Sequence, residues 1–237
     1  MTAQLRTTLR SRDEDLRELM DDPACDPERL RATLRRFRTV NRLISGWGAV
    51  YRNNLAPFLV GLRRPARVLD LGSGGGDIVL RLSALAAKDG LHVEWVGADP
   101  DPRALHAANE RPRPPQVTFR AADANDLIGA GERFDAVLSN HVLHHLDTVQ
   151  IRAFADASAQ LSTGIVLHSD IARSHAAYAL YAIGITPLAP GTFLRTDGLR
   201  SIRRSFRRAE LSDVLGSEWT VDTPSAFRLL ASRSGHA

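Results

Sequence analysis

The stretch ARVLDLGSGGGDI, residues 66–78, constrains the fold of this chain more than any other feature. A run of branched apolar residues ends in Asp70 and is followed by glycines at positions 72, 74, 75 and 76. An apolar run that meets a glycine cluster and then an amphipathic segment is typical of a strand–turn–helix unit. Such a turn exposes backbone N–H groups at the start of a helix, where nucleotide-like ligands commonly bind.

Short apolar runs and helical segments continue to alternate along the chain. The expected strands are 66–71, 92–99, 117–123, 134–140 and 164–170, and two more are expected in WTVDT and AFRLLAS near the C-terminus. Regular alternation implies right-handed crossovers and a parallel sheet with helices on both faces. We therefore predict the α/β class: a doubly wound, Rossmann-like, mostly parallel seven-stranded sheet with an antiparallel last strand and an N-terminal helical cap.

The residues before the first strand have a helical pattern instead. Apolar residues recur there at three- and four-residue spacing from about residue 12 to residue 60. We expect residues 1–62 to form the helical cap and residues 63–237 to form the ligand-binding core, with a lid insertion at about 173–200. One arginine-rich helix is expected over residues 201–216.

Composition excludes several classes of protein. The chain has 237 residues, 43% of them hydrophobic, which suits a globular domain with a sizeable core. The single cysteine, Cys25, rules out an internal disulfide framework, and no apolar run approaches the roughly 18 residues of a membrane-spanning helix. The net charge of +4 is too small and too diffuse to predict nucleic-acid binding. We expect a cytoplasmic protein without a membrane span.

The spacing of the glycines narrows the choice of ligand. A dinucleotide-binding fingerprint G-x-G-x-x-G that starts at Gly72 would need a third glycine where the chain has Asp77. No Gly-Lys-Ser/Thr follows, which also excludes a phosphate-binding P-loop. The chain instead has an acid followed by glycines at every second position.

The pattern Asp70-x-Gly72-x-Gly74-x-Gly76 resembles the first motif of the class I S-adenosylmethionine-dependent methyltransferases. The resemblance extends from the first expected strand to about residue 172. It implies that the turn, including Ser73, wraps the amino-acid end of S-adenosyl-L-methionine and that Asp70 acts on the ammonium group. S-adenosyl-L-homocysteine would be the product.

Further acids follow the next two expected strands, in the order that the resemblance requires. Asp99 ends the second strand, about 20 residues beyond the glycines, where a carboxylate can accept both ribose hydroxyl groups. Asp123 follows the third strand and can accept the adenine amino group. The other expected cofactor contacts are Pro100, Ala122, Ala124 and Asn140.

Three histidines follow the fourth expected strand, and a fourth lies in the fifth. His141, His144 and His145 have the i, i+3, i+4 spacing of one helix face. A phenol has a pKa near 10, so a positioned histidine would help its methylation as a general base; we expect His144 or His141 in that role and His145 and His168 near the acceptor. No resident metal is expected, although convergence of these imidazoles on a zinc-like ion is an alternative.

The segment after the fifth strand commonly shapes the acceptor pocket in this family. The resemblance places Arg173, Tyr178 and Tyr181 there, which suits a small apolar or aromatic acceptor. The dense arginines from Arg195 to Arg208 could meet a carboxylated substrate or an acidic carrier, or form a solvated helix face.

The expected function is methyl transfer from S-adenosylmethionine to a small molecule, with O-methylation of a phenolic, quinol or polyketide hydroxyl favoured. The chain resembles methyltransferases of ubiquinone and menaquinone synthesis and of polyketide tailoring in secondary metabolism. C-methylation of an aromatic ring is the nearest alternative; an NAD-dependent oxidoreductase and a non-catalytic S-adenosylmethionine-binding protein are alternatives of other classes. Asn140 is not followed by Pro-Pro-aromatic, which argues against a nucleic-acid substrate. A homodimer is an option that the sequence leaves open.

Overall fold

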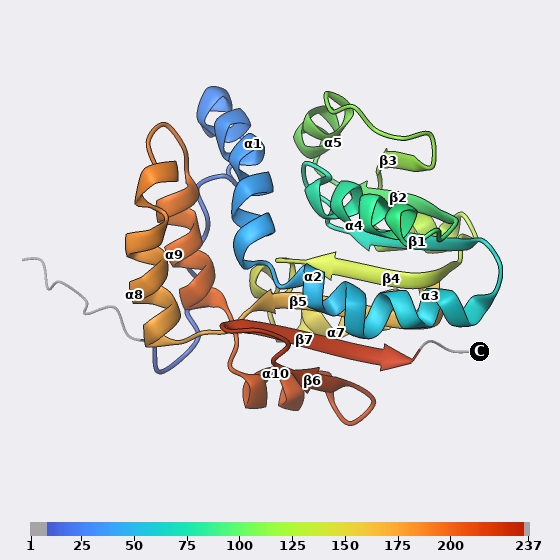
Figure 1. Ribbon diagram of the computed structural model, residues 1–237. Coiled ribbons are helices and arrows are strands. Elements are labelled where there is room, and N and C mark those ends of the chain that lie inside the picture. The colour runs from blue at the N-terminus through green and yellow to red at the C-terminus, as the bar shows by residue number, and fades with distance from the viewer. Residues whose placement is uncertain (1–8, 235–237) are drawn as a thin grey trace, which may run out of the picture.

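A seven-stranded sheet with the order β3-β2-β1-β4-β5-β7-β6 forms the centre of the protein (Figure 1). This computed structural model describes residues 9–234. Strands β1 to β5 are parallel, whereas β7 is antiparallel to both β5 and β6. The strands are β1 Ala66–Leu71, β2 Val93–Asp99, β3 Val117–Ala121, β4 Phe134–Asn140, β5 Ser162–Ile171, β6 Thr220–Asp222 and β7 Arg228–Ser234. The predicted fold class is confirmed.

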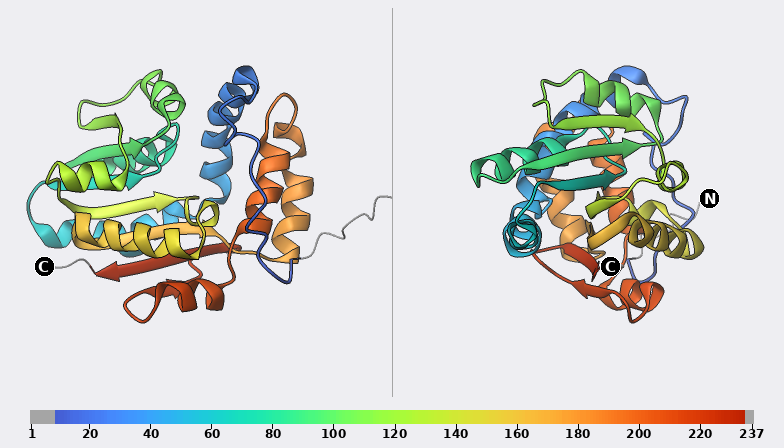
Figure 2. Two further views of the ribbon diagram at one scale, coloured as in Figure 1. Left: turned by 180° about the vertical axis from the view of Figure 1, so that it is seen from behind. Right: turned by 90° about the vertical axis from the view of Figure 1, so that its right-hand side faces the viewer.

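Helices cover both faces of the sheet, as the alternating pattern requires (Figures 1 and 2). One apolar cluster joins the sheet to α2 Trp47–Val50, the π-helical turn η1 Tyr51–Leu55, α3 Ala56–Leu62 and α4 Asp77–Lys88. A second cluster joins the opposite face to α6 Ala124–Gly129, α7 Thr148–Leu161 and α10 Arg208–Leu215. Helix α5, Pro102–Asn109, packs beside β2 and β3. No helix within residues 9–234 is long and apolar enough to cross a membrane.

The remaining helices stand beyond the carboxyl ends of the parallel strands (Figure 1). They are α1 Pro27–Ile44, the short η2 Leu143–His145, α8 His175–Gly184, η3 Thr186–Leu188 and α9 Leu194–Arg204. Small apolar clusters fasten them to one another: Val40 of α1 packs against Ile185 and Leu194. These helices form a separate layer over the edge of the sheet where ligands bind in open α/β folds.

The segment before α1 does not have the expected helical structure. Helix α1 begins at Pro27, capped by Asp26, and residues 9–26 form an irregular segment, here called the strap. In the strap, the backbone N–H groups of Leu19 and Met20 donate to the carboxylate of Asp197 on α9, at 2.8 and 3.0 Å. A tertiary contact thus replaces the helical hydrogen bonds that the apolar spacing predicted.

The expected single helix over residues 201–216 is also wrong. Helix α9 ends at Arg204 and α10 begins at Arg208, with an extended backbone between them. The carbonyl group of Phe206 accepts the N–H of Arg173, at 2.8 Å, and its side chain is buried. The chain turns at this point because Phe206 joins the end of β5 and the core beneath it.

Candidate functional site

A cavity of about 1340 Å³ lies at the carboxyl ends of the parallel strands. The glycine turn after β1 lines one end, and α1, α8 and α9 line the other. Pockets for one drug-sized ligand usually measure 300–1,000 Å³. This cavity is therefore large enough for two small molecules side by side.

The glycine turn needs glycine for its backbone conformation and for its packing. Gly72, Gly74 and Gly76 have φ angles of 73°, 52° and 73°, which residues with a side chain rarely adopt. A Cβ atom on Gly72 would lie 2.6 Å from the side chain of Val142, and one on Gly76 would lie 2.3 Å from the ring of Phe119. Side chains are therefore excluded at the place where the backbone reaches the cavity.

Asp70 is a buried carboxylate directly beneath this turn. It is 2% exposed, and its Oδ1 has no hydrogen-bond partner among residues 9–234. Burial, and then the nearby carboxylates of Asp77 and Asp99, raise the pKa of Asp70 well above its usual value. A cationic group bound beside Gly72 and Ser73, which line the cavity, would relieve this unpaired acid. The arrangement fits the ammonium group of an amino-acid ligand.

Asp99 connects the end of β2 to the glycine turn. Its Oδ2 accepts the N–H of Gly74, and its Oδ1 accepts the N–H of Asp101, both at 2.9 Å. Burial raises the pKa of Asp99, and these N–H groups oppose the rise. Asp99 and Pro100 both line the cavity, where this carboxylate can meet a pair of hydroxyl groups.

Asp123 has a structural role as well as a place at the cavity. Its Oδ1 accepts the N–H of Asp126 at 2.9 Å, which makes Asp123 the N-cap of α6. Asp123 lines the cavity together with Ala122 and Ala124, so these small side chains leave one wall flat. The three residues lie where a planar base would fit.

Asn140, at the end of β4, belongs to a hydrogen-bond network that spans the sheet edge. Its Oδ1 accepts the indole N–H of Trp47 and a guanidinium N–H of Arg228, each at 3.0 Å. Arg228 also donates to His141 Nε2 at 2.7 Å. Burial lowers the pKa of Arg228 to about 10, with Asp170 opposing it. Burial, and then the charge of Arg228, hold the pKa of His141 well below its usual value, so its imidazole is neutral.

His144 is held between two carboxylates. It is 1% exposed; its Nδ1 lies 2.7 Å from Asp170 Oδ1 and its Nε2 lies 3.2 Å from Glu18 Oε1. Burial alone would lower the pKa of His144, but the two carboxylates raise it to about 9. His144 therefore carries both ring protons at neutral pH and has no lone pair to offer, which argues against the expected role as general base.

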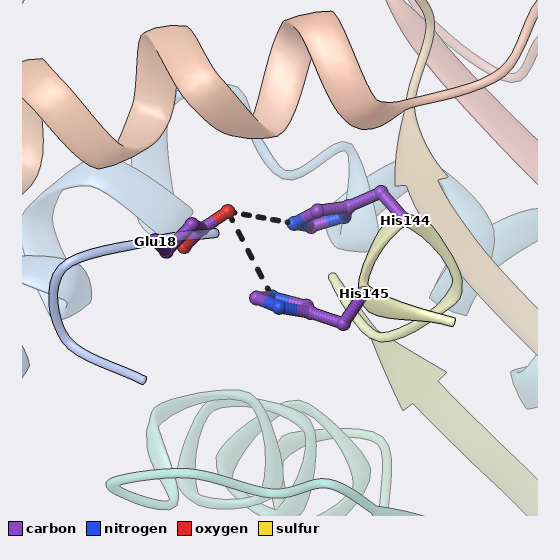
Figure 3. Close-up of side chains that lie close together, drawn as sticks. All are labelled: Glu18, His144 and His145. Carbon is purple, nitrogen blue, oxygen red and sulfur yellow. Dashed lines mark hydrogen bonds and ion pairs between the residues drawn. The ribbon is translucent and has the colours of Figure 1, made fainter. Parts of the chain in front are cut away.

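His145 faces the same glutamate. Its Nδ1 lies 3.2 Å from Asp21 Oδ2, and its Nε2 lies 3.9 Å from Glu18 Oε1. Figure 3 shows both imidazoles directed at Glu18. Glu18, Asp21, His144 and His145 all line the cavity. The three histidines do not share a helix face, because His141 has a φ of 62° and η2 begins only at Leu143.

His168 does not lie at the cavity. It is fully buried, with its ring 5.1 Å from that of Phe154 and 5.3 Å from that of Trp219, and its Nδ1 lies 2.8 Å from Ser139 Oγ. Burial lowers the pKa of His168 to about 3, with Asp170 opposing. The alternative in which four imidazoles converge is therefore wrong, and this placement argues against acceptor binding by His168.

The three candidates after β5 lie in different environments. Arg173 is 2% exposed and forms an ion pair with Glu210, away from the cavity. Tyr178 packs beside Leu9 of the strap. Tyr181 lines the cavity, and its hydroxyl group donates to a backbone carbonyl of α9 at 2.8 Å. Of these three, Tyr181 alone is placed to contact an acceptor.

Three arginines of α9, Arg200, Arg203 and Arg204, bind the strap rather than a substrate. Arg200 donates to the carbonyl oxygen of Arg17, and Arg203 pairs with Asp13. Arg204 donates to the carbonyl oxygen of Leu16 and also to those of the two histidines in η2. The arginine cluster thus fixes the strap against the cavity wall.

Several residues of the site were not predicted from the sequence. Glu18 stands in the charged run DEDLRELM, where nothing distinguishes it from a surface residue of a helix. Arg228 and Trp47 enter the site through Asn140, which is 88 and 93 positions away along the chain.

Comparisons with known proteins agree with this geometry. Residues 68–164, less than half of the chain, match the family model described as "Methyltransferase domain". The glycine turn and the three strand ends that follow it lie within the matched part. This part of the chain is therefore similar to a methyltransferase domain.

Relatives that the chain matches include O-methyltransferases of ubiquinone biosynthesis. The "Ubiquinone biosynthesis O-methyltransferase" of Rhizobium etli is 35% identical over 116 residues, which cover 48% of this chain and 44% of the relative. That of Azorhizobium caulinodans is 31% identical over 120 residues, covering 50% and 45%. The chain thus matches less than half the length of these curated relatives.

Solved structures share the fold at low sequence identity. Human N-acetylserotonin methyltransferase in complex with SAM aligns with a TM-score of 0.60 at 11% identity, covering 86% of this chain and 55% of that one. Magnesium protoporphyrin IX methyltransferase from Synechocystis with bound SAH aligns with a TM-score of 0.51 at 20% identity, covering 84% and 83%. At these identities the likeness concerns the fold alone.

Proposed function

We propose that this protein transfers a methyl group from S-adenosylmethionine to a hydroxyl group of a small aromatic molecule, such as a phenol, a quinol or a polyketide. The observation that carries the proposal is the single cavity that runs from the glycine turn to an apolar end between α1, α8 and α9. Methyl transfer needs the donor and the acceptor in contact. Holding the two in the correct geometry supplies a large part of the reduction in the activation barrier. The matched ubiquinone O-methyltransferases support the choice of an oxygen acceptor.

Three acids and the glycine turn would hold the cofactor. The unpaired Asp70 would face the ammonium group, Asp99 the ribose hydroxyl groups, and Asp123 the adenine amino group. Bound there, S-adenosylmethionine supplies a methyl group already activated on a sulfonium. S-adenosylhomocysteine would be left in the same place.

The other end of the cavity suits an apolar acceptor. Its lining includes Phe37, Leu180, Tyr181, Ile185 and Leu188. Side chains of this kind bind flat aromatic or long apolar molecules and exclude water from them. An activated ring carbon would meet the same walls, so C-methylation is the second candidate.

The acceptor oxygen must lose its proton during the transfer. Of the two histidines proposed for catalysis, His141 is neutral and lines the cavity, although its Nε2 accepts from Arg228. His144, held in its protonated form by Asp170 and Glu18, would position the acceptor end rather than take up a proton. We therefore propose His141 as the base, which requires Arg228 to release its Nε2, and a positioning role for His144.

Calorimetric titration with S-adenosylhomocysteine, with NADH as the control, tests the cofactor assignment. We expect one molecule to bind per chain at micromolar concentration and NADH not to bind. Incubation with methyl-labelled S-adenosylmethionine and a panel of phenols, quinols and C-nucleophilic rings then distinguishes O- from C-methylation by the position of the label. Binding of NADH alone would overturn the proposal, and binding without methyl transfer to any acceptor class would favour a non-catalytic cofactor-binding protein.

A further inference from the structure

Glu18, His144 and His145 bring three potential metal ligands together at the cavity wall (Figure 3). Glu18 Oε1 lies 3.2 Å from His144 Nε2 and 3.9 Å from His145 Nε2. A tetrahedral zinc ion with bonds of about 2.0–2.1 Å separates its ligand atoms by roughly 3.3 Å. The three atoms therefore already stand close to the spacing of a metal site.

The outer nitrogen of each imidazole is bound to a carboxylate. His144 Nδ1 lies 2.7 Å from Asp170 Oδ1, and His145 Nδ1 lies 3.2 Å from Asp21 Oδ2. Histidines that bind metals almost always donate their other N–H to a carboxylate, a carbonyl group or water, which fixes the ring and directs Nε2 at the ion. Two histidines in this arrangement, both facing one glutamate, are an observation independent of the spacing.

A second cluster of potential ligands lies nearby but is less suitable. His141, His144 and Asp170 also have ligand atoms within 4.8 Å of one another. Arg228 already donates to His141 Nε2 at 2.7 Å, so a cation there would stand beside a guanidinium group. Asp170 is occupied by the ring and the backbone N–H of His144. The cluster around Glu18 has no arginine donating to any of its three ligand atoms among the contacts of the described residues.

We propose that Glu18, His144 and His145 bind a divalent transition metal of the zinc class, with the fourth coordination position open to the cavity. Two imidazoles and one carboxylate suit zinc, whereas magnesium prefers oxygen ligands alone. Three protein ligands and one open position are typical of a zinc site that binds water or substrate.

The open coordination position would bind the methyl acceptor, an inference that rests on the proposed function. A hydroxyl oxygen of the acceptor would bind there and lose its proton to His141, the base proposed above, because a divalent ion lowers the pKa of a bound oxygen. The oxygen then forms its bond to the methyl carbon, the sulfur–carbon bond breaks, and its electron pair stays on sulfur.

Metal binding is tested on the full chain without a histidine tag, stripped with chelator and dialysed, in the absence of cofactor and acceptor. Calorimetry with Zn²⁺ alone should show one ion per chain, and Mg²⁺ should bind at least about 100-fold more weakly. Glu18→Gln and His145→Gln should each weaken Zn²⁺ binding by at least about tenfold, and Asp21→Asn by roughly tenfold. His106→Gln is the matched control. His106 is an exposed histidine of α5 that pairs with Glu110, so its substitution should leave the zinc affinity unchanged.

Two further measurements keep the outcome decisive. Co²⁺ in place of zinc should give the visible absorption of a four-coordinate ion, and His145→Gln should abolish it. Titration of each variant with S-adenosylhomocysteine shows whether the fold and the cofactor end are intact. Failure of the cofactor proposal can therefore be distinguished from failure of the metal proposal. Absence of saturable Zn²⁺ binding, or equal losses in His106→Gln and His145→Gln, would mean an adventitious ion only and would overturn the metal site.

Discussion

The two ends of the cavity are built in different ways. At the cofactor end, the chain supplies the glycine turn, Asp99, Asp123 and Asn140 in sequence order, each at the carboxyl end of the next parallel strand. At the acceptor end, Glu18 of the strap meets His144, which lies 126 positions later. The first end depends on local backbone geometry, and the second depends on contacts between distant segments.

This difference predicts how each end of the cavity responds to amino-acid substitutions. Glycines with positive φ angles cannot be replaced by residues with side chains without strain. Single substitutions at the cofactor end should therefore have large effects. The acceptor end is held by many hydrogen bonds, each of modest strength. Its responses should be smaller and should leave the cofactor end unchanged.

The largest expected effect is that of Gly76→Ala. The new Cβ would lie 2.3 Å from the ring of Phe119 at a φ of 73°, so overpacking adds to backbone strain. We expect a loss of about 3 kcal/mol or more in the free energy of unfolding, measured by urea denaturation. Gly90→Ala is the control, since Gly90 has a φ of 72° but no described atom within 4 Å of its Cβ position. Equal losses in the two variants would show that packing at the turn is unimportant.

The next effect concerns cofactor affinity. Asp99→Asn should weaken S-adenosylhomocysteine binding roughly 10- to 100-fold, because hydrogen bonds to a charged group contribute about 1.5–3 kcal/mol. Asp101→Asn, two positions away and paired with Arg103, should change the affinity less than about threefold. Calorimetric titration of both variants measures the difference. Equal weakening would contradict the assignment of the ribose to Asp99.

A smaller effect is expected where the strap is attached. Asp197→Ala removes the acceptor for the N–H groups of Leu19 and Met20, so the strap should open more often. Trypsin cleavage after Arg17 should become about tenfold faster, while the affinity for S-adenosylhomocysteine stays within about twofold. Asp213→Ala, an exposed position on α10, serves as the control. A parallel loss of cofactor affinity would show that the two ends are coupled.

A pH dependence of stability is also expected, and it distinguishes two buried histidines. His168 has a folded pKa of about 3 against 6.5 for a free histidine, so the unfolded chain binds the proton first as the pH falls. The contribution of His168 to the free energy of unfolding is present above pH 6.5. It is lost as the pH falls below this value, by up to about 1.4 kcal/mol per pH unit. His144 has the opposite sign, because its pKa is raised to about 9 and its contribution is lost as the pH rises from 6.5 through 9.

His168→Phe keeps the aromatic packing against Phe154 and Trp219 but cannot titrate. Urea denaturation from pH 7 to pH 4 should show a shallower acid loss for this variant than for the unchanged protein, with the loss above pH 7 unaltered. Equal slopes in acid would mean that His168 is not the group responsible.

The sequence predicted the sheet and the cofactor end because both have local signals. Buried parallel strands are short apolar runs, and the strand ends place Asp99 and Asp123 without knowledge of any distant contact. His168 was misplaced because it lies three positions before the end of β5, where the side chain is buried beneath the cavity edge. The strap was misread because apolar spacing in a charged segment predicts a helix, whereas Asp197 binds its backbone N–H groups.

Most of the arginines that attach the strap recognise main-chain oxygen atoms. Arg204 donates to the carbonyl oxygen of Leu16, and Arg173 and Arg207 both donate to that of Leu9. Every amino acid offers the same carbonyl group, so most strap side chains can be exchanged while the strap stays attached. Acceptor preference can therefore drift in evolution, or be varied in a designed library, through side chains of residues 9–26, with the cofactor end left as it is.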